Sequence, residues 1–77
     1  MSELRDNVRE EIERIYTDAL SNGYVNEDDI CDELNDYFDE VEDCDDAVLK
    51  QAYGLALDAM DDDGVAKLKA ALDLLAA

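Results

Sequence analysis

The sequence predicts an all-α fold, a compact bundle of about four short helices in a single domain that spans residues 1–77. Apolar residues recur at helical spacing in four stretches of the chain. There is no proline, and two of the three glycines lie between those stretches. Because a chain of this length buries only about 60–65% of its unfolded surface, we expect a thin core.

The first predicted helix has one apolar face, formed by residues at i, i+4, i+7 and i+8: Leu4, Val8, Ile12, Ile15, Tyr16 and Ala19. The segment "SNG" at 21–23 predicts its end, because Gly23 suits the left-handed position that follows a helix.

The second predicted helix begins after Asn26, which is a good N-cap residue. Asp29 lies three residues further on, as in a capping box, and Val25 and Ile30 can form a hydrophobic staple. Its apolar side continues at helical spacing through Leu34, Tyr37, Phe38 and Val41. We expect Tyr37 and Phe38 to belong to the core.

The third predicted helix covers roughly residues 46–60, with Asp43 or Asp45 as its cap. Ten of these fifteen residues are apolar, and a helix that is apolar nearly all round is buried. It is therefore either the central helix or a dimer surface, and Gly54 would allow another backbone to approach it closely. The segment "DDDG" predicts a turn, and Val65, Leu68, Ala71, Leu72 and Leu75 indicate a fourth helix.

Charge is the unusual property of this chain. Twenty-three acidic residues stand against six basic ones, for a net charge of −17. Such a charge argues against direct binding to nucleic acid or to anionic membranes, and it favours basic proteins or cations as partners. The charge is also uneven: residues 1–14 hold three arginines and five acids, whereas residues 15–49 hold thirteen acids and no base. A surface adapted to high salt should be acidic on all sides.

On a helical wheel, the acids of the second helix lie opposite its apolar side. Asp29, Glu33, Asp36 and Glu40 form one stripe, and Asp28, Asp32 and Asp39 form a second beside it. Glu42, Asp43, Asp45 and Asp46 extend these stripes into the next turn. We call these eleven residues the acidic surface. Like charges four residues apart destabilise a helix by about 0.2–0.5 kcal/mol per pair, so we expect the surface to serve a partner outside the fold.

In size, helicity, carboxylate stripes and acidity, the chain resembles the small acidic inhibitor proteins of bacteriophages that mimic DNA. This resemblance is one of class and covers no aligned motif. It implies an anti-restriction or anti-CRISPR protein in the host cytoplasm, which occupies the cationic groove of a DNA- or RNA-binding protein. The acidic surface would take the place of the phosphates, whose binders are grooves of Lys and Arg.

Two other interpretations remain open. The first is an acidic adaptor that binds a basic protein through an ordinary interface, with Tyr24 as an exposed anchor. The second is a salt-adapted helical domain whose charge serves no partner. The apolar third helix and the segment "LDLLAA" also make a homodimer possible.

Enzyme, cofactor and metal functions find little support. The chain has no histidine, no nucleophile beside a plausible base and no phosphate-binding glycine loop, so we expect a non-enzyme without cofactors. Length, acidity and four helices are similar to those of acyl carrier proteins, but "NEDDICDEL" lacks the serine to which that family attaches its arm.

"DALSNGYVNEDD" and "AMDDDGVAKLKA" approach the calcium-loop pattern without matching it, since Leu20 stands at a ligand position and the second begins and ends on alanine. The N-terminus lacks the apolar region of a signal peptide, and no stretch is long and apolar enough to cross a membrane. We therefore expect a cytoplasmic protein in which Cys31 and Cys44 are reduced and half-buried.

Overall fold

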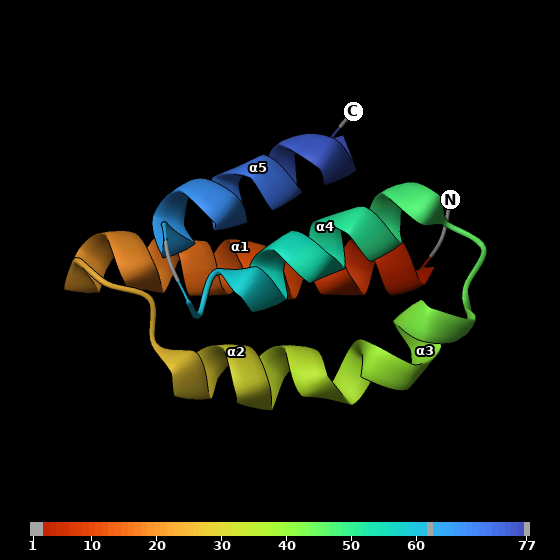
Figure 1. Ribbon diagram of the computed structural model, residues 1–77, viewed down its shortest axis with the longest axis horizontal. Helices are drawn as coiled ribbons and strands as arrows, with labels where there is room; N and C mark the ends of the chain where they lie inside the picture. Colours follow the sequence, from red (N-terminus) through yellow and green to blue (C-terminus); the bar gives the residue numbers. More distant parts are fainter. Residues whose placement is uncertain (1–2, 62, 77) are drawn as a thin grey trace.

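The computed structural model describes residues 3–61 and 63–76, and these form an all-α bundle (Figure 1). The elements in chain order are α1 (Glu3–Asn22), α2 (Glu27–Leu34), the 3₁₀ turn η1 (Asn35–Tyr37), α3 (Phe38–Asp43), α4 (Ala47–Asp58) and α5 (Gly64–Ala76). The predicted fold class is thus confirmed, with α2, η1 and α3 in the place of the predicted second helix.

Helix α4 is the central element of the bundle. It packs against α1, α2, α3 and α5, and Figure 1 shows α5 on one side of it and the α2–α3 segment on the other. Its buried residues are Leu49, Ala52, Tyr53 and Ala56. The third helix therefore takes the central position, which was one of the two alternatives for it.

Every α-helix contributes apolar side chains to one core. Ile12, Ile30, Leu34, Leu49 and Leu68 are fully buried there, and the described part of the chain buries no polar or charged residue. The helical periodicity predicted four of these positions, and Leu49 belongs to the third helix, whose burial was predicted from its apolar composition.

The two aromatic residues predicted for the core behave differently from each other. Tyr37 is partly buried and packs against the core. The prediction for Phe38 was wrong, because its side chain is 40% exposed.

The prediction of one continuous second helix was also wrong, and Tyr53 supplies the physical reason. Its buried hydroxyl donates a hydrogen bond to the Leu34 carbonyl at the end of α2. The Phe38 amide donates to the Asn35 carbonyl three residues back instead of to Leu34. The chain therefore passes through a 3₁₀ turn before α3 begins.

Side-chain caps start α2 and α4. The Asn26 side chain accepts a hydrogen bond from the Asp28 amide at 2.9 Å, as predicted for an N-cap. The Asp46 carboxylate accepts from the Leu49 amide at 3.0 Å, so the cap of α4 is Asp46 and neither Asp43 nor Asp45. The difference is local, because α4 begins one residue later than predicted.

Two glycines close the turns at one end of the bundle. Gly23 has φ +83° and donates to the Ala19 carbonyl at 2.8 Å, as predicted for the end of α1. Gly64 starts α5 in close contact with the α1–α2 loop: a Cβ atom there would lie 2.6 Å from the Ala59 carbonyl oxygen and would overlap Val25. One member of the predicted "DDDG" turn, Asp62, lies outside the described residues.

Candidate functional site: the acidic surface

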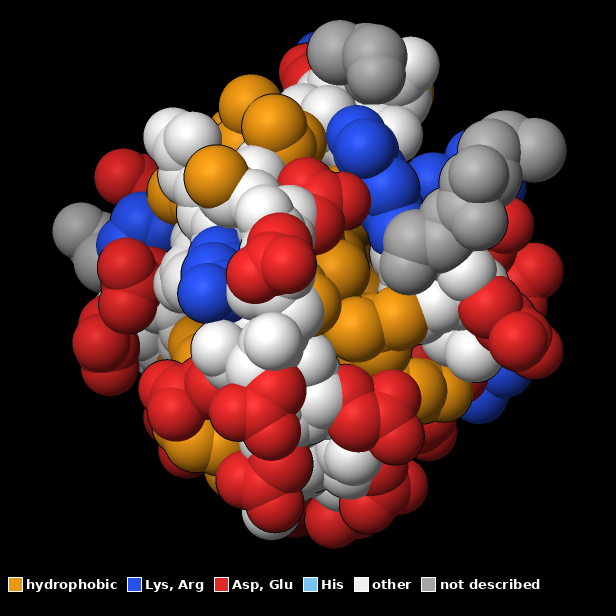
Figure 2. Space-filling model, turned by 90° about the vertical axis from the view of Figure 1, so that its right-hand side faces the viewer, with side chains coloured by type: hydrophobic (Ala, Val, Ile, Leu, Met, Phe, Trp, Pro, Cys, Tyr) orange, Lys and Arg blue, Asp and Glu red, His pale blue; other side chains and the backbone are white. Residues whose placement is uncertain are grey.

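The acidic surface occupies the side of the molecule that α2, η1 and α3 form. Ten of the seventeen residues from 27 to 43 are Asp or Glu, and none is basic. Figure 2 shows Asp and Glu side chains crowding the lower part of one face, which is the side of α2 and α3 in Figure 1, while the Lys and Arg side chains on this face mostly lie higher. The uneven charge of the sequence is therefore also uneven in space.

Most of the carboxylates that the sequence assigned to this surface face solvent. The exposed ones are Asp28, Asp32, Asp36, Asp39, Glu40, Glu42, Asp43 and Asp45, and the partly buried ones are Asp29, Glu33 and Asp46. A partner approaching from the α2–α3 side would meet the eight exposed residues first.

The structure does not keep the two predicted stripes in one line. A 3₁₀ turn advances by about 120° per residue where an α-helix advances by about 100°. Three residues of η1 therefore rotate α3 by about 60° relative to the wheel of a continuous helix. Glu40 consequently lies out of register with Asp29 and Glu33, and Asp39 lies out of register with Asp28 and Asp32. The surface consists of two short acidic patches joined at Asp36.

Glu33 does not belong to the solvent-facing patch, because it turns toward α1. Its Oε2 lies 3.4 Å from Nη1 of Arg14, and the same guanidinium nitrogen lies 3.5 Å from Oε2 of Glu11. One arginine of α1 thus holds two carboxylates, one from its own helix and one from α2. This contact partly offsets the electrostatic repulsion between the acidic residues of α1 and those of α2.

Glu11 is the most strongly constrained acid in this contact. Its side chain is only 15% exposed, and its Oε2 is buried without a hydrogen-bond donor in the described part of the chain. The pKa of Glu11 is raised, first by a hydrogen bond with Glu33, which requires a proton on one of the two carboxylates. Burial and the negative charge of Glu33 raise this pKa further, and the positive charge of Arg14 opposes the shift. This pair was not predicted from the sequence. The signal was present, because Glu11 lies three residues from Val8 and four from Ile15 on the buried side of α1.

Asp46 has a structural role in this protein. Its carboxylate caps α4 through the Leu49 amide, and its Oδ2 lies 3.5 Å from Nη1 of Arg5. An acid engaged by both a helix N-terminus and an arginine is less available to a partner than its exposed neighbours. Asp45, one residue earlier, is exposed.

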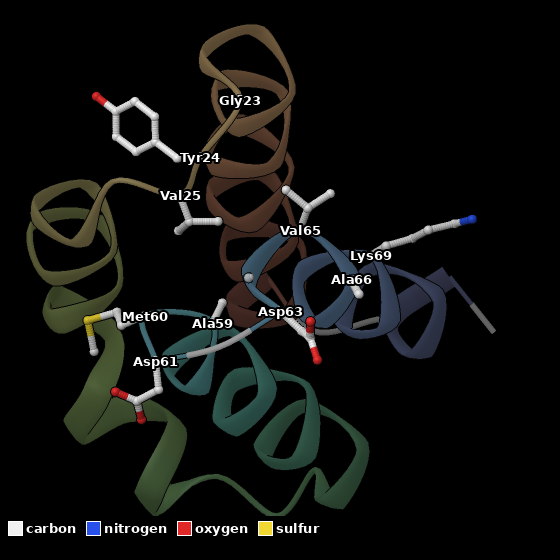
Figure 3. Close-up of a pocket in the computed structure, with 11 residues that line it drawn as sticks. Gly23, Tyr24, Val25, Ala59, Met60, Asp61, Asp63, Val65, Ala66 and Lys69 are labelled. Carbon is white, nitrogen blue, oxygen red and sulfur yellow. The ribbon is translucent and has the colours of Figure 1, made fainter.

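Tyr24 lies at the edge of an open hollow near the start of α2. The hollow measures about 670 Å³ and lies between the α1–α2 loop and the turn from α4 to α5. Figure 3 shows the Tyr24 ring directed outward and Val25 lying nearer to the middle of the hollow. Tyr24 is 61% exposed, as predicted for an anchor residue.

The two cysteines are free thiols in different surroundings. Cys44 is partly buried, as predicted, and its thiol donates to the Val41 carbonyl at 3.0 Å. Cys31 is exposed, so its predicted half-burial was wrong. Its Sγ lies 3.9 Å from Sδ of Met60.

Neither a metal site nor a membrane-spanning helix occurs among the described residues. Among residues 3–61 and 63–76, no three or more Cys, Asp or Glu side chains are grouped so that they could hold a metal ion. None of the described helices is long and apolar enough to cross a membrane. Comparison with protein-family models, curated proteins and solved structures found no match for the chain.

Proposed function

We propose that this protein inhibits a nucleic-acid-binding protein by presenting the acidic surface where the phosphates of a nucleic acid would dock. The target would be a defence nuclease or effector, as for the phage-encoded anti-restriction and anti-CRISPR proteins that the chain resembles in class. The observation that carries the proposal is the density of carboxylates in α2, η1 and α3, which no lysine or arginine interrupts.

The charge density of α2, η1 and α3 supports the proposal. The seventeen residues of α2, η1 and α3 follow a path of roughly 27 Å, counted at 1.5 Å per α-helical and 2.0 Å per 3₁₀ residue. Their ten carboxylates therefore provide about one charge per 2.7 Å. One strand of a duplex provides a charge per about 3.4 Å and both strands together one per about 1.7 Å. The charge density of this seventeen-residue segment lies between these two values.

The cost of the surface supports a role outside the fold. Each like-charge pair at i, i+4 costs about 0.2–0.5 kcal/mol, and the described α2 and α3 contain no base to compensate it. A cationic groove would relieve this repulsion on binding and would attract the protein over a long range.

A pull-down with charge-matched baits tests the proposal. The first variant reverses exposed acids of the acidic surface: Asp28→Lys, Asp32→Lys, Asp36→Lys and Asp39→Lys. The control reverses four exposed acids elsewhere: Glu10→Lys, Glu13→Lys, Asp18→Lys and Asp73→Lys. Both change the net charge from −17 to about −9, because each replacement adds two positive charges.

Bacterial lysate is passed over each bait, and the baits are washed at about 0.1 M and then about 0.5 M salt, since salt shortens the range of exposed charges. We expect the wild type and the control to retain a basic nucleic-acid-binding protein and the acidic-surface variant not to retain it. Added DNA or RNA should release this protein from the wild type. Equal loss from both variants would show that net charge alone drives capture, and the proposal would then be wrong.

An adaptor that binds a basic protein through an ordinary interface is the second candidate, and the exposed Tyr24 beside its hollow favours it. In that case the partner would survive the wash at high salt, would ignore added nucleic acid and would be lost on Tyr24→Ala.

A further inference from the structure

Helix α4 leaves part of its side uncovered next to α3. An open groove of about 460 Å³ lies there, lined by Phe38, Val41 and Glu42 of α3 and by Lys50, Tyr53, Gly54 and Leu57 of α4. Its apolar lining includes Phe38, whose ring is 40% exposed and lies 6.4 Å from the ring of Tyr53, measured between centroids. The groove thus offers apolar surface directly beside the carboxylates of α3.

Gly54 lines this groove and lowers the stability of the helix in which it lies. It occupies the interior of α4, where a glycine is less stable than an alanine. The sequence suggested that it admits a close approach of another backbone. Among the described residues no other backbone approaches it, since a Cβ atom at Gly54 would meet nothing within 4 Å there. Gly64, by contrast, is required by contacts with Val25 and Ala59.

We propose that the groove between α3 and α4 receives one large apolar side chain of the partner, carried on a segment whose neighbouring residues are Lys or Arg. This proposal rests on the proposed function and adds to it the apolar anchor that an acidic surface lacks. Gly54 keeps the groove open for that side chain.

Charge complementarity selects this occupant. The rim on the α3 side carries Glu42, and Asp39 and Asp43 of the same helix are exposed. Lys50 is the one basic residue of the lining. A second copy of this chain would bring its own charge of −17 against these acids, and the repulsion opposes a dimer through this face. A basic segment would gain attraction from the carboxylates, and its apolar residue would gain burial in the groove.

Two synthetic peptides provide the probe. Each has the flanks Lys-Arg-Lys on both sides of a central residue, which is Phe in one peptide and Ser in the other. Dissociation constants are measured by fluorescence anisotropy at about 50 mM salt. We expect the Phe peptide to bind wild type about fivefold or more tightly than the Ser peptide, because partial burial of an aromatic side chain is worth about that ratio.

Gly54→Met fills the groove, and Gln51→Met is the matched control because Gln51 is exposed on the same helix and does not line the groove. The preference for the Phe peptide should fall to about onefold in Gly54→Met and persist in Gln51→Met. A melting temperature of Gly54→Met at or above that of wild type shows that the loss does not come from unfolding.

Each alternative outcome has a distinct meaning. Equal affinity of wild type for the two peptides, or an unchanged preference in Gly54→Met, would overturn the groove proposal and leave the acidic surface unaffected. Capture of the lysate partner that survives the four reversals at Asp28, Asp32, Asp36 and Asp39 would instead refute the proposed function, whatever the two peptides do. A dimer in sedimentation experiments that Gly54→Met abolishes would show that a second copy occupies the groove, and the assigned occupant would be wrong.

Discussion

Removing the Tyr53 hydroxyl should destabilise the protein and alter the end of α2. This hydroxyl is the donor to the Leu34 carbonyl, and the Tyr53 side chain is only 4% exposed. Tyr53→Phe leaves a buried acceptor without that donor, which costs about 1–2 kcal/mol. For a domain of this size, such a loss lowers the melting temperature by about 5–10 °C. Tyr24→Phe is the control, since its side chain is mostly exposed.

The alkaline limb of the stability curve provides a second readout. Burial, with a smaller contribution from the charge of Asp36, raises the pKa of Tyr53 to about 12, above the ordinary value of about 10. A pKa raised by folding contributes stability that is complete below pH 10 and is lost as the pH rises toward 12. Wild type should therefore lose this stability between pH 10 and 12, and Tyr53→Phe should not. Urea unfolding of both proteins from pH 7 to pH 12 checks both effects. The role given to the hydroxyl would be refuted if their unfolding free energies differ by less than about 0.3 kcal/mol at pH 7, or if both proteins lose the same stability above pH 10.

Three further predictions concern the turn, the acid pair and the overall charge. Gly64→Ala should lower the unfolding free energy by about 1–3 kcal/mol through the contacts of its new methyl group with Val25 and Ala59, and urea unfolding that matches wild type would contradict this. Glu11→Gln should raise stability at pH 7 by roughly 0.5 kcal/mol, because it removes one charge of a like-charged pair. Since a raised carboxyl pKa makes wild type more stable as the pH falls, this advantage should shrink toward pH 5, and a pH-independent advantage would argue against the pair. Added NaCl at about 0.5 M should raise the melting temperature of wild type by about 5 °C through screening of like charges, and no rise would show that the acids do not strain the fold.

The features that the sequence predicted well are those decided by neighbours in the chain. Helical spacing of apolar residues identified the core, as in the run from Val8 to Ile15. Asn26 and Gly23 were recognised because a cap acts on amides and carbonyls a few residues away. Tyr24 was expected to be exposed because it lies beside the acidic helix, and it is exposed.

The features that the sequence did not predict depend on contacts between distant segments. The break after Leu34 arises from a hydroxyl nineteen residues away, and no local pattern in "ELNDYFDEV" indicates it. The same break turns Phe38 toward solvent and rotates the second half of the acidic surface. Glu33 was assigned to solvent because its pairing with Arg14 requires knowing that α1 and α2 lie side by side.

Competition with nucleic acid tests the central proposal most directly. The partner recovered in the pull-down is mixed with a fluorescent duplex, or with RNA if RNA released it, and this protein is titrated in at about 0.1 M salt. We expect this protein to displace the nucleic acid completely, and the concentration needed for half-displacement should rise in proportion to the nucleic-acid concentration. For the variant with reversed Asp28, Asp32, Asp36 and Asp39, that concentration should rise at least about a hundredfold. The control variant should lie within about threefold of wild type. A stable complex that holds the partner, the nucleic acid and this protein together would contradict the proposal, because one groove cannot contain both acidic ligands.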